Sequence, residues 1–128
     1  MKAKHPIMKT SFVYTALKVR NLDKTLKFYT SILGMELLVR KHVEQTNGEM
    51  CVLKGGTNRL ELNHYKGQRV KKGTNLDHLA FETDQFHALL KRLKRRHVRV
   101  HEYLETEKWD RFFLADPDGN WIEVYHRK

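Results

Sequence analysis

The amino-acid sequence predicts an α+β protein made of two βαβββ modules, whose strands form an open, cup-shaped mixed sheet. The chain repeats itself: a shift of 64 residues places Tyr14 on His78, and a shift of 62 residues places Glu61 on Glu123. In each half a short strand leads into a helix, and three further strands follow. A period of this length indicates two paired modules rather than the stacked units of a solenoid.

The 128 residues are expected to form a single domain, because a chain of this length suits one hydrophobic core. A loose basic arm at residues 1–10 comes first. Module one then spans about residues 11–65, a basic and glycine-containing linker spans 66–75, and module two spans about 76–126.

The helix of module one is expected to begin near Asn21 or Asp23, both of which are good N-cap residues. Its apolar residues recur at helical spacing, and Gly34 is a plausible end. The remaining segments alternate apolar and polar residues and are separated by turn signals. The expected strands of this module are Phe12–Val19, Glu36–Val43, Glu49–Leu53 and Arg59–Asn63.

Module two repeats this order. Its helix is expected from Thr83 or Asp84 to about Arg96, and His97 stands where a glycine would usually end a helix. The sequence Asp-Pro-Asp-Gly at 116–119 predicts a tight turn, because proline presets φ and glycine permits the last position. The expected strands are Asp77–Glu82, Val98–Tyr103, Arg111–Ala115 and Trp121–His126.

Alternation along the strands predicts which side chains share a face. In the first strand of each module and in the last, one face is apolar and can pack under the helices. The opposite face carries Tyr14, Glu61, His78 and Glu123. Buried carboxylates are costly unless they are paired, hydrogen-bonded or bound to a metal. Two carboxylates and a histidine on equivalent faces therefore predict a metal site.

Composition places the chain in the cytoplasm. The single cysteine, Cys51, cannot form an internal disulfide, which fits a reducing compartment. The first ten residues lack the apolar run of a signal peptide, and no stretch approaches the roughly 18 apolar residues of a membrane span. We therefore expect a cytoplasmic protein without membrane contact.

The formal net charge of +10 predicts attraction to anions, nucleic acid included. Much of this charge lies in residues 91–96, where it also suits the solvated end of a helix. The chain has no zinc finger, phosphate-binding loop or RNA-recognition signature. We expect at most weak, non-specific binding of nucleic acid, and a preference for acidic small molecules.

Several segments in this order resemble the vicinal oxygen chelate superfamily, which contains glyoxalase I, bleomycin-resistance proteins, fosfomycin-resistance enzymes and extradiol dioxygenases. The resemblance covers about residues 11–126 and is closest to single-domain, glyoxalase I-like members. Its specificity is high for the fold and low for the function, because one fold hosts many chemistries. The matching segments are Asn21–Lys24, Lys27–Tyr29, Leu33–Met35, Leu76–Phe81 and Asp116–Glu123.

The resemblance implies one divalent metal ion (Zn, Ni, Mn or Fe) and no organic cofactor. Glu61, His78 and Glu123 match three of the four ligand positions of glyoxalase I-like members. Tyr14 stands at the first position, where those members have His or Gln; tyrosine, with an ordinary pKa of about 10, is a poor ligand. The site is therefore either completed by water or free of metal.

Substrate contacts are implied at Tyr14, Lys18 and Asn63. Lys18 matches, in charge type, a basic position that contacts a glutathione carboxylate in glyoxalase I. Asn63 shares the face of Glu61. Related single-domain proteins often build their site from one strand pair of each subunit, so we also expect a homodimer.

The function implied first is a glyoxalase I-like lyase or isomerase, of the lactoylglutathione lyase or epimerase type. It would act on a small, acidic substrate with vicinal oxygens, and Glu123 would be the general base. The alternative is a non-catalytic ligand-binding protein of the bleomycin-resistance type, which Tyr14 favours. A dioxygenase or a fosfomycin-resistance-type transferase is disfavoured, because the first histidine ligand of those enzymes is missing.

Overall fold

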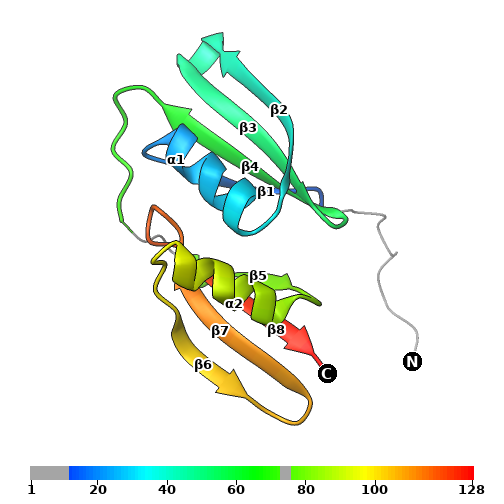
Figure 1. The fold of residues 1–128 in the computed structure, drawn as a ribbon. Coiled ribbons are helices and arrows are strands. Elements are labelled where there is room, and N and C mark those ends of the chain that lie inside the picture. The colour runs from blue at the N-terminus through cyan, green and yellow to red at the C-terminus, as the bar shows by residue number, and fades with distance from the viewer. Residues whose placement is uncertain (1–11, 73–75) are drawn as a thin grey trace, which may run out of the picture.

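The computed structural model describes residues 12–72 and 76–128, so the predicted arm at 1–10 lies outside the described residues. Module one, drawn from blue to green in Figure 1, contains two short helices in sequence before its second strand. Its elements are β1 (Thr15–Lys18), α1 (Leu22–Lys27), the π-helical η1 (Phe28–Ile32), β2 (Glu36–Val43), the 3-10 turn η2 (Glu44–Thr46), β3 (Gly48–Gly55) and β4 (Asn58–Tyr65).

Module two, drawn from green to red, repeats the order of strand, helix and three strands (Figure 1). Its elements are β5 (Leu79–Glu82), α2 (Phe86–Arg95), β6 (His101–Glu105), β7 (Trp109–Ala115) and β8 (Trp121–Arg127). Among the residues that the structure describes, no helix is both long enough and apolar enough to cross a membrane.

The predicted α+β class and the two βαβββ modules are confirmed. Each module forms a four-stranded mixed sheet of its own, in the order β1-β4-β3-β2 or β5-β8-β7-β6. The first and last strands of each module run parallel, and the other neighbours are antiparallel. The two sheets are equivalent, because Ala16 pairs with Glu61 in one and Ala80 with Glu123 in the other.

Several predicted boundaries are wrong by two or three residues, and three of them have a local cause. β1 begins at Thr15 rather than Phe12, because its pairing with β4 begins at Thr15. α2 begins at Phe86, since the Thr83 hydroxyl accepts a hydrogen bond from the Gln85 backbone (3.0 Å) and holds a turn ahead of the helix. β6 begins at His101, because the chain leaves α2 through His97 with a left-handed φ of 55°.

The core lies between each sheet and its helix and is continuous across the two modules. Strand residues on the predicted apolar faces, such as Leu17, Leu62 and Val124, are buried. Phe28 and Leu93 add one residue from each helical segment. The faces were therefore predicted correctly, and the opposite faces are left to carry the polar site residues.

One buried residue of module one is the free thiol of Cys51, on β3. It lies in the core cluster, away from solvent. Burial raises the pKa of this thiol above its ordinary value. The thiol is therefore a structural side chain rather than a nucleophile.

The Asp-Pro-Asp-Gly turn between β7 and β8 joins the modules. The buried carboxylate of Asp118 accepts a hydrogen bond from the Arg20 guanidinium (2.9 Å) and one from the Thr25 hydroxyl (3.3 Å). Gly119 closes the turn with a φ of 82°, which favours glycine. These contacts fix the start of β8, the strand that carries Glu123.

Candidate functional site

The candidate site lies on the face of β5, β7 and β8 that points away from the core, which we name the module-two face. Glu123 is at its centre, because its neighbours across the sheet are Ala80 on β5 and Phe113 on β7. The adjacent residues of β8, Ile122 and Val124, are buried in the core, so alternation turns Glu123 outward. Its side chain is largely but not fully shielded from solvent.

His78 is brought next to Glu123. The Nε2 atom of His78 lies 4.0 Å from Oε1 of Glu123, and the ring packs edge-on against Phe113. On the other side, Nδ1 of His78 lies 2.6 Å from a carboxylate oxygen of Asp77. A carboxylate accepts hydrogen bonds, so Nδ1 is the donor to Asp77, and Nε2 is left facing Glu123.

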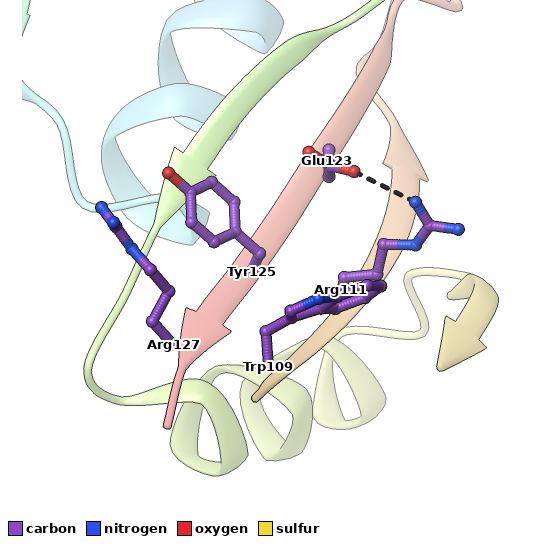
Figure 2. A pocket seen from close by; sticks show the side chains of 5 residues that line it. All are labelled: Trp109, Arg111, Glu123, Tyr125 and Arg127. Carbon is purple, nitrogen blue, oxygen red and sulfur yellow. Dashed lines mark ion pairs between the residues drawn. The ribbon is translucent and has the colours of Figure 1, made fainter. Parts of the chain in front are cut away.

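Arg111, on β7, is a further member of this site that the sequence reasoning did not select. Its Nη1 atom lies 3.5 Å from Oε2 of Glu123, so the two carboxylate oxygens face different partners (Figure 2). The residue had been treated only as part of a predicted strand. Its position two residues from Phe113 on an alternating strand is the signal that places it on the same face.

A cavity of about 370 Å³ opens beside Glu123 on the module-two face. Figure 2 shows its walls, which come from β7 and β8 alone. Aromatic rings and guanidinium groups alternate across these two strands, because Trp109 pairs with Arg127 and Arg111 pairs with Tyr125. The lining residues are Trp109, Arg111, Glu123, Tyr125 and Arg127.

Glu61 occupies the corresponding position on module one. Its Oε1 atom accepts a hydrogen bond from the Asn63 amide (3.1 Å), and both residues line a cavity of about 310 Å³ with Tyr65. Lys18 faces the same side, with Nζ 5.8 Å from the centre of the Tyr65 ring. Three of the predicted residues thus lie together on one face of the module-one sheet: Lys18, Glu61 and Asn63.

Tyr14 lies apart from these residues. It precedes β1, its side chain is 49% exposed, and it lines a separate cavity of about 610 Å³. That cavity is bounded by both the β1 and the β5 segments, including Thr15 and Ala80. Tyr14 is therefore not placed as a ligand beside Glu61.

The structure pairs His78 with Glu123 but leaves Glu61 on the other module. Within residues 12–72 and 76–128, no three His, Cys, Asp or Glu side chains come together so as to hold one metal ion. One ion could reach both atoms of this pair, because 4.0 Å is less than twice a typical ligand bond of about 2.1 Å, but the pair would have to close to give a tetrahedral angle. Imidazole nitrogen and carboxylate oxygen suit Zn, Ni, Mn or Fe.

The chain is similar in sequence to lactoylglutathione lyases. That of Neisseria meningitidis serogroup A is 32% identical over 124 residues, which cover 91% of this chain and 90% of the relative. Among solved structures, the trypanothione-dependent glyoxalase I of Leishmania major is 26% identical with a TM-score of 0.79. That alignment covers 92% of this chain and 87% of the other.

A protein of a different kind has the same fold. An antibiotic-binding protein from Streptomyces sp. CB03234 is 26% identical with a TM-score of 0.76, over 95% of this chain and the whole of the other. A sequence model described as the Glyoxalase/Bleomycin resistance protein/Dioxygenase superfamily matches residues 11–124. Since this match spans nearly the whole chain, the protein belongs to the glyoxalase/bleomycin resistance/dioxygenase superfamily.

Proposed function

We propose that the protein is a metal-dependent lyase or isomerase of the glyoxalase I type, which acts on a small, acidic substrate with vicinal oxygens. One observation carries the proposal: His78, held by Asp77, presents Nε2 to the carboxylate of Glu123 at 4.0 Å. A histidine oriented by a second carboxylate is the usual arrangement of a metal-ligating imidazole. The similarity to lactoylglutathione lyases supports the same class of reaction.

Glu61, His78 and Glu123 would hold the metal ion, and the remaining positions would be left to water and substrate. Because Glu61 lies on the other module, the proposal requires that module one of one chain meet module two of a second chain. A bound divalent ion would polarise the substrate carbonyl and so acidify the neighbouring C–H bond. No organic cofactor is needed for this reaction.

The chemical step is assigned to Glu123. Its carboxylate would remove the proton of the carbon beside the polarised carbonyl and would return it one carbon away, as a general base and then a general acid. Lys18 and Asn63, which flank Glu61, would bind acidic and polar groups of the substrate. Tyr14, half exposed at the start of the first strand, would contact the substrate rather than the metal.

A homodimer is part of the proposal. The segment Phe12–Tyr14 and the strand residues Leu37–Val39 expose large apolar side chains. In addition, the chain-edge strands β1 and β5 each pair on one side only in the described part of the sheets. A second copy would cover apolar surface and sheet edges of this kind. Light scattering at micromolar concentration should give twice the 15.3 kDa mass of the chain.

Metal titration tests the proposal directly. Purified protein, stripped with a chelator and then titrated with Ni²⁺, Mn²⁺ or Zn²⁺ in a calorimeter, should bind one ion per site. His78→Ala should lose binding, whereas His87→Ala, a change on helix α2, should keep it. Absence of binding for all three metal ions would exclude the metal-dependent mechanism.

The second candidate function is binding without catalysis. It is favoured by Tyr14, which replaces a ligand residue, and by the similarity to an antibiotic-binding protein. The charge of +10 would then select an anionic ligand rather than a cationic one. Glu123→Gln separates the two functions, because it should abolish turnover by an enzyme and leave ligand affinity in a binding protein nearly unchanged.

A further inference from the structure

Two guanidinium groups line the module-two cavity, and they differ in what they already bind. Arg127 donates two hydrogen bonds to the carboxylate of Glu82, at 2.5 and 3.1 Å. Arg111 has one acidic neighbour, Glu123, at 3.5 Å, which is too long for a strong hydrogen bond. The Nε atom of Arg111 is buried without an acceptor. Much of the hydrogen-bonding capacity of Arg111 is therefore unused within the described residues.

Two aromatic rings lie beside the guanidinium of Arg111, in addition to the carboxylate of Glu123. The centre of its guanidinium lies 5.4 Å from the ring of Trp109 and 5.5 Å from the ring of Phe113. Both distances fall within the range of about 6 Å in which a cation is attracted to a ring face. Figure 2 shows the guanidinium beside Trp109, with its end directed to Glu123. A side chain held in this way loses little freedom when a ligand binds.

The chemistry of this group selects the ligand. A planar guanidinium matches a carboxylate, which can accept two parallel N–H bonds from it. The cavity of about 370 Å³ is at the small end of ligand pockets, so it suits a small molecule. Without Arg111, the negative charge of Glu123 would repel an acid from this space.

The distance between Arg111 and Glu123 also restricts where the acid group sits. Nη1 of Arg111 is 3.5 Å from Oε2 of Glu123, so a carboxylate bound to Arg111 would lie next to Glu123.

We propose that Arg111 binds the carboxylate of the substrate, and that the substrate is a small carboxylic acid. The role of Glu123 rests on the proposed function. Carboxylate binding by Arg111 does not, because it needs only the walls of the module-two cavity.

Ligand-observed NMR titration of the full chain tests this inference, with lactate and pyruvate as acidic probes and lactamide as the uncharged probe. Wild-type protein should bind both acids more tightly than lactamide. Arg111→Gln should weaken binding of the acids at least about tenfold, which corresponds to 1.4 kcal/mol, and leave lactamide unchanged. Arg111→Lys keeps the positive charge but cannot donate two parallel N–H bonds to a carboxylate, so its affinity for the acids should lie between those of the wild type and Arg111→Gln.

Arg95→Gln is the matched control, since it removes the same charge from the exposed end of α2 and should bind the acids as the wild type does. Thermal unfolding of each variant shows whether it is folded; if Arg111→Gln is not, the comparison rests on Arg111→Lys. The inference is overturned if wild type binds lactate no more tightly than lactamide, or if Arg95→Gln loses as much affinity as Arg111→Gln.

Metal titration of the same samples separates this inference from the proposed function. If the protein binds the acids but no metal ion, carboxylate binding by Arg111 is supported and the metal-dependent lyase mechanism is excluded. Metal binding and turnover that persist in Arg111→Gln, with unchanged acid affinity, would remove the role of Arg111 alone.

Discussion

The hydroxyl of Tyr29 donates a 2.7 Å hydrogen bond to the carboxylate of Asp116, across 87 residues of sequence and between the two modules. Both side chains are buried. The other carboxylate oxygen of Asp116 accepts hydrogen bonds from the backbone of Asp118 and Asn120 and so shapes the turn before β8. The helical segment of module one therefore helps to fix the strand that carries Glu123.

Replacing Tyr29 with Phe should destabilise the fold. The change leaves the ring in place but deprives a buried carboxylate of one hydrogen bond, at a cost of about 1–3 kcal/mol in the free energy of unfolding. Urea unfolding measures this. Tyr103→Phe is the matched control, because that hydroxyl also bonds a carboxylate, on Glu105, but at an exposed site. Equal losses in the two variants would contradict the assigned role of Tyr29.

Stability should also fall at alkaline pH because of Tyr29. Burial, reinforced by the charge of Asp116, raises the pKa of Tyr29 well above its ordinary value. In the unfolded chain the phenol ionises near about pH 10. Since the folded pKa is the higher of the two, the stability linked to this proton is complete below about pH 10 and declines above it, by up to about 1.4 kcal/mol per pH unit.

The measurement is the free energy of unfolding at about pH 9, 10 and 11. Tyr29→Phe lacks the titrating group, so its stability should decline less steeply over this range than that of the wild type. All other ionisable groups are common to both proteins, so their contributions cancel in the comparison. Parallel curves would show that Tyr29 does not carry the effect.

His97→Gly should stabilise the protein. His97 follows α2 with a φ of 55°, a conformation that costs a residue with a Cβ roughly 1–2 kcal/mol. Glycine removes this strain, but it also lowers the stability by about 0.5–1 kcal/mol, because the unfolded chain gains conformational freedom. We expect a small net gain, visible as a higher melting temperature. The same change at His87, inside α2, should instead lower it.

Asp77→Ala should weaken metal binding without unfolding the protein. Asp77 is exposed and its contact in the site is with Nδ1 of His78, which it holds in the orientation that directs Nε2 to Glu123. Loss of a partner of this kind typically lowers metal affinity about 10- to 100-fold. Calorimetric titration with Ni²⁺ should show this loss, whereas Asp84→Ala, another exposed carboxylate, should retain wild-type affinity. Identical affinities would leave Asp77 without a positioning role.

Much of the fold could be predicted because its signals are local. The alternation of residues around Leu17 and Val124 predicted the buried faces, and the repeat placed Glu61 and Glu123 at equivalent positions. Asn21 was one of the two residues predicted to cap the first helix, with Asp23, and its side chain accepts a hydrogen bond from the backbone of Lys24. The buried faces and the helix cap depend on residues close together in the sequence, and the repeat depends on comparing two such local segments.

The rest depended on contacts that the sequence does not reveal by itself. Arg111 became a site residue only once the pairing of β7 with β8 placed it one row from Glu123. The division into two sheets, which separates Glu61 from His78, depends on how two modules of the same order meet. Sequence spacing predicted which faces carry polar residues but not which faces lie opposite each other.

Because Cys51 is the single thiol of the chain and is buried in module one, the protein contains its own reporter of partial opening. A thiol reagent can reach the side chain only when the sheet of module one opens. Comparing the rate of modification with the rate of global unfolding would show whether the modules open separately or together. If the modules open separately, module one could exchange between two chains while module two stays folded.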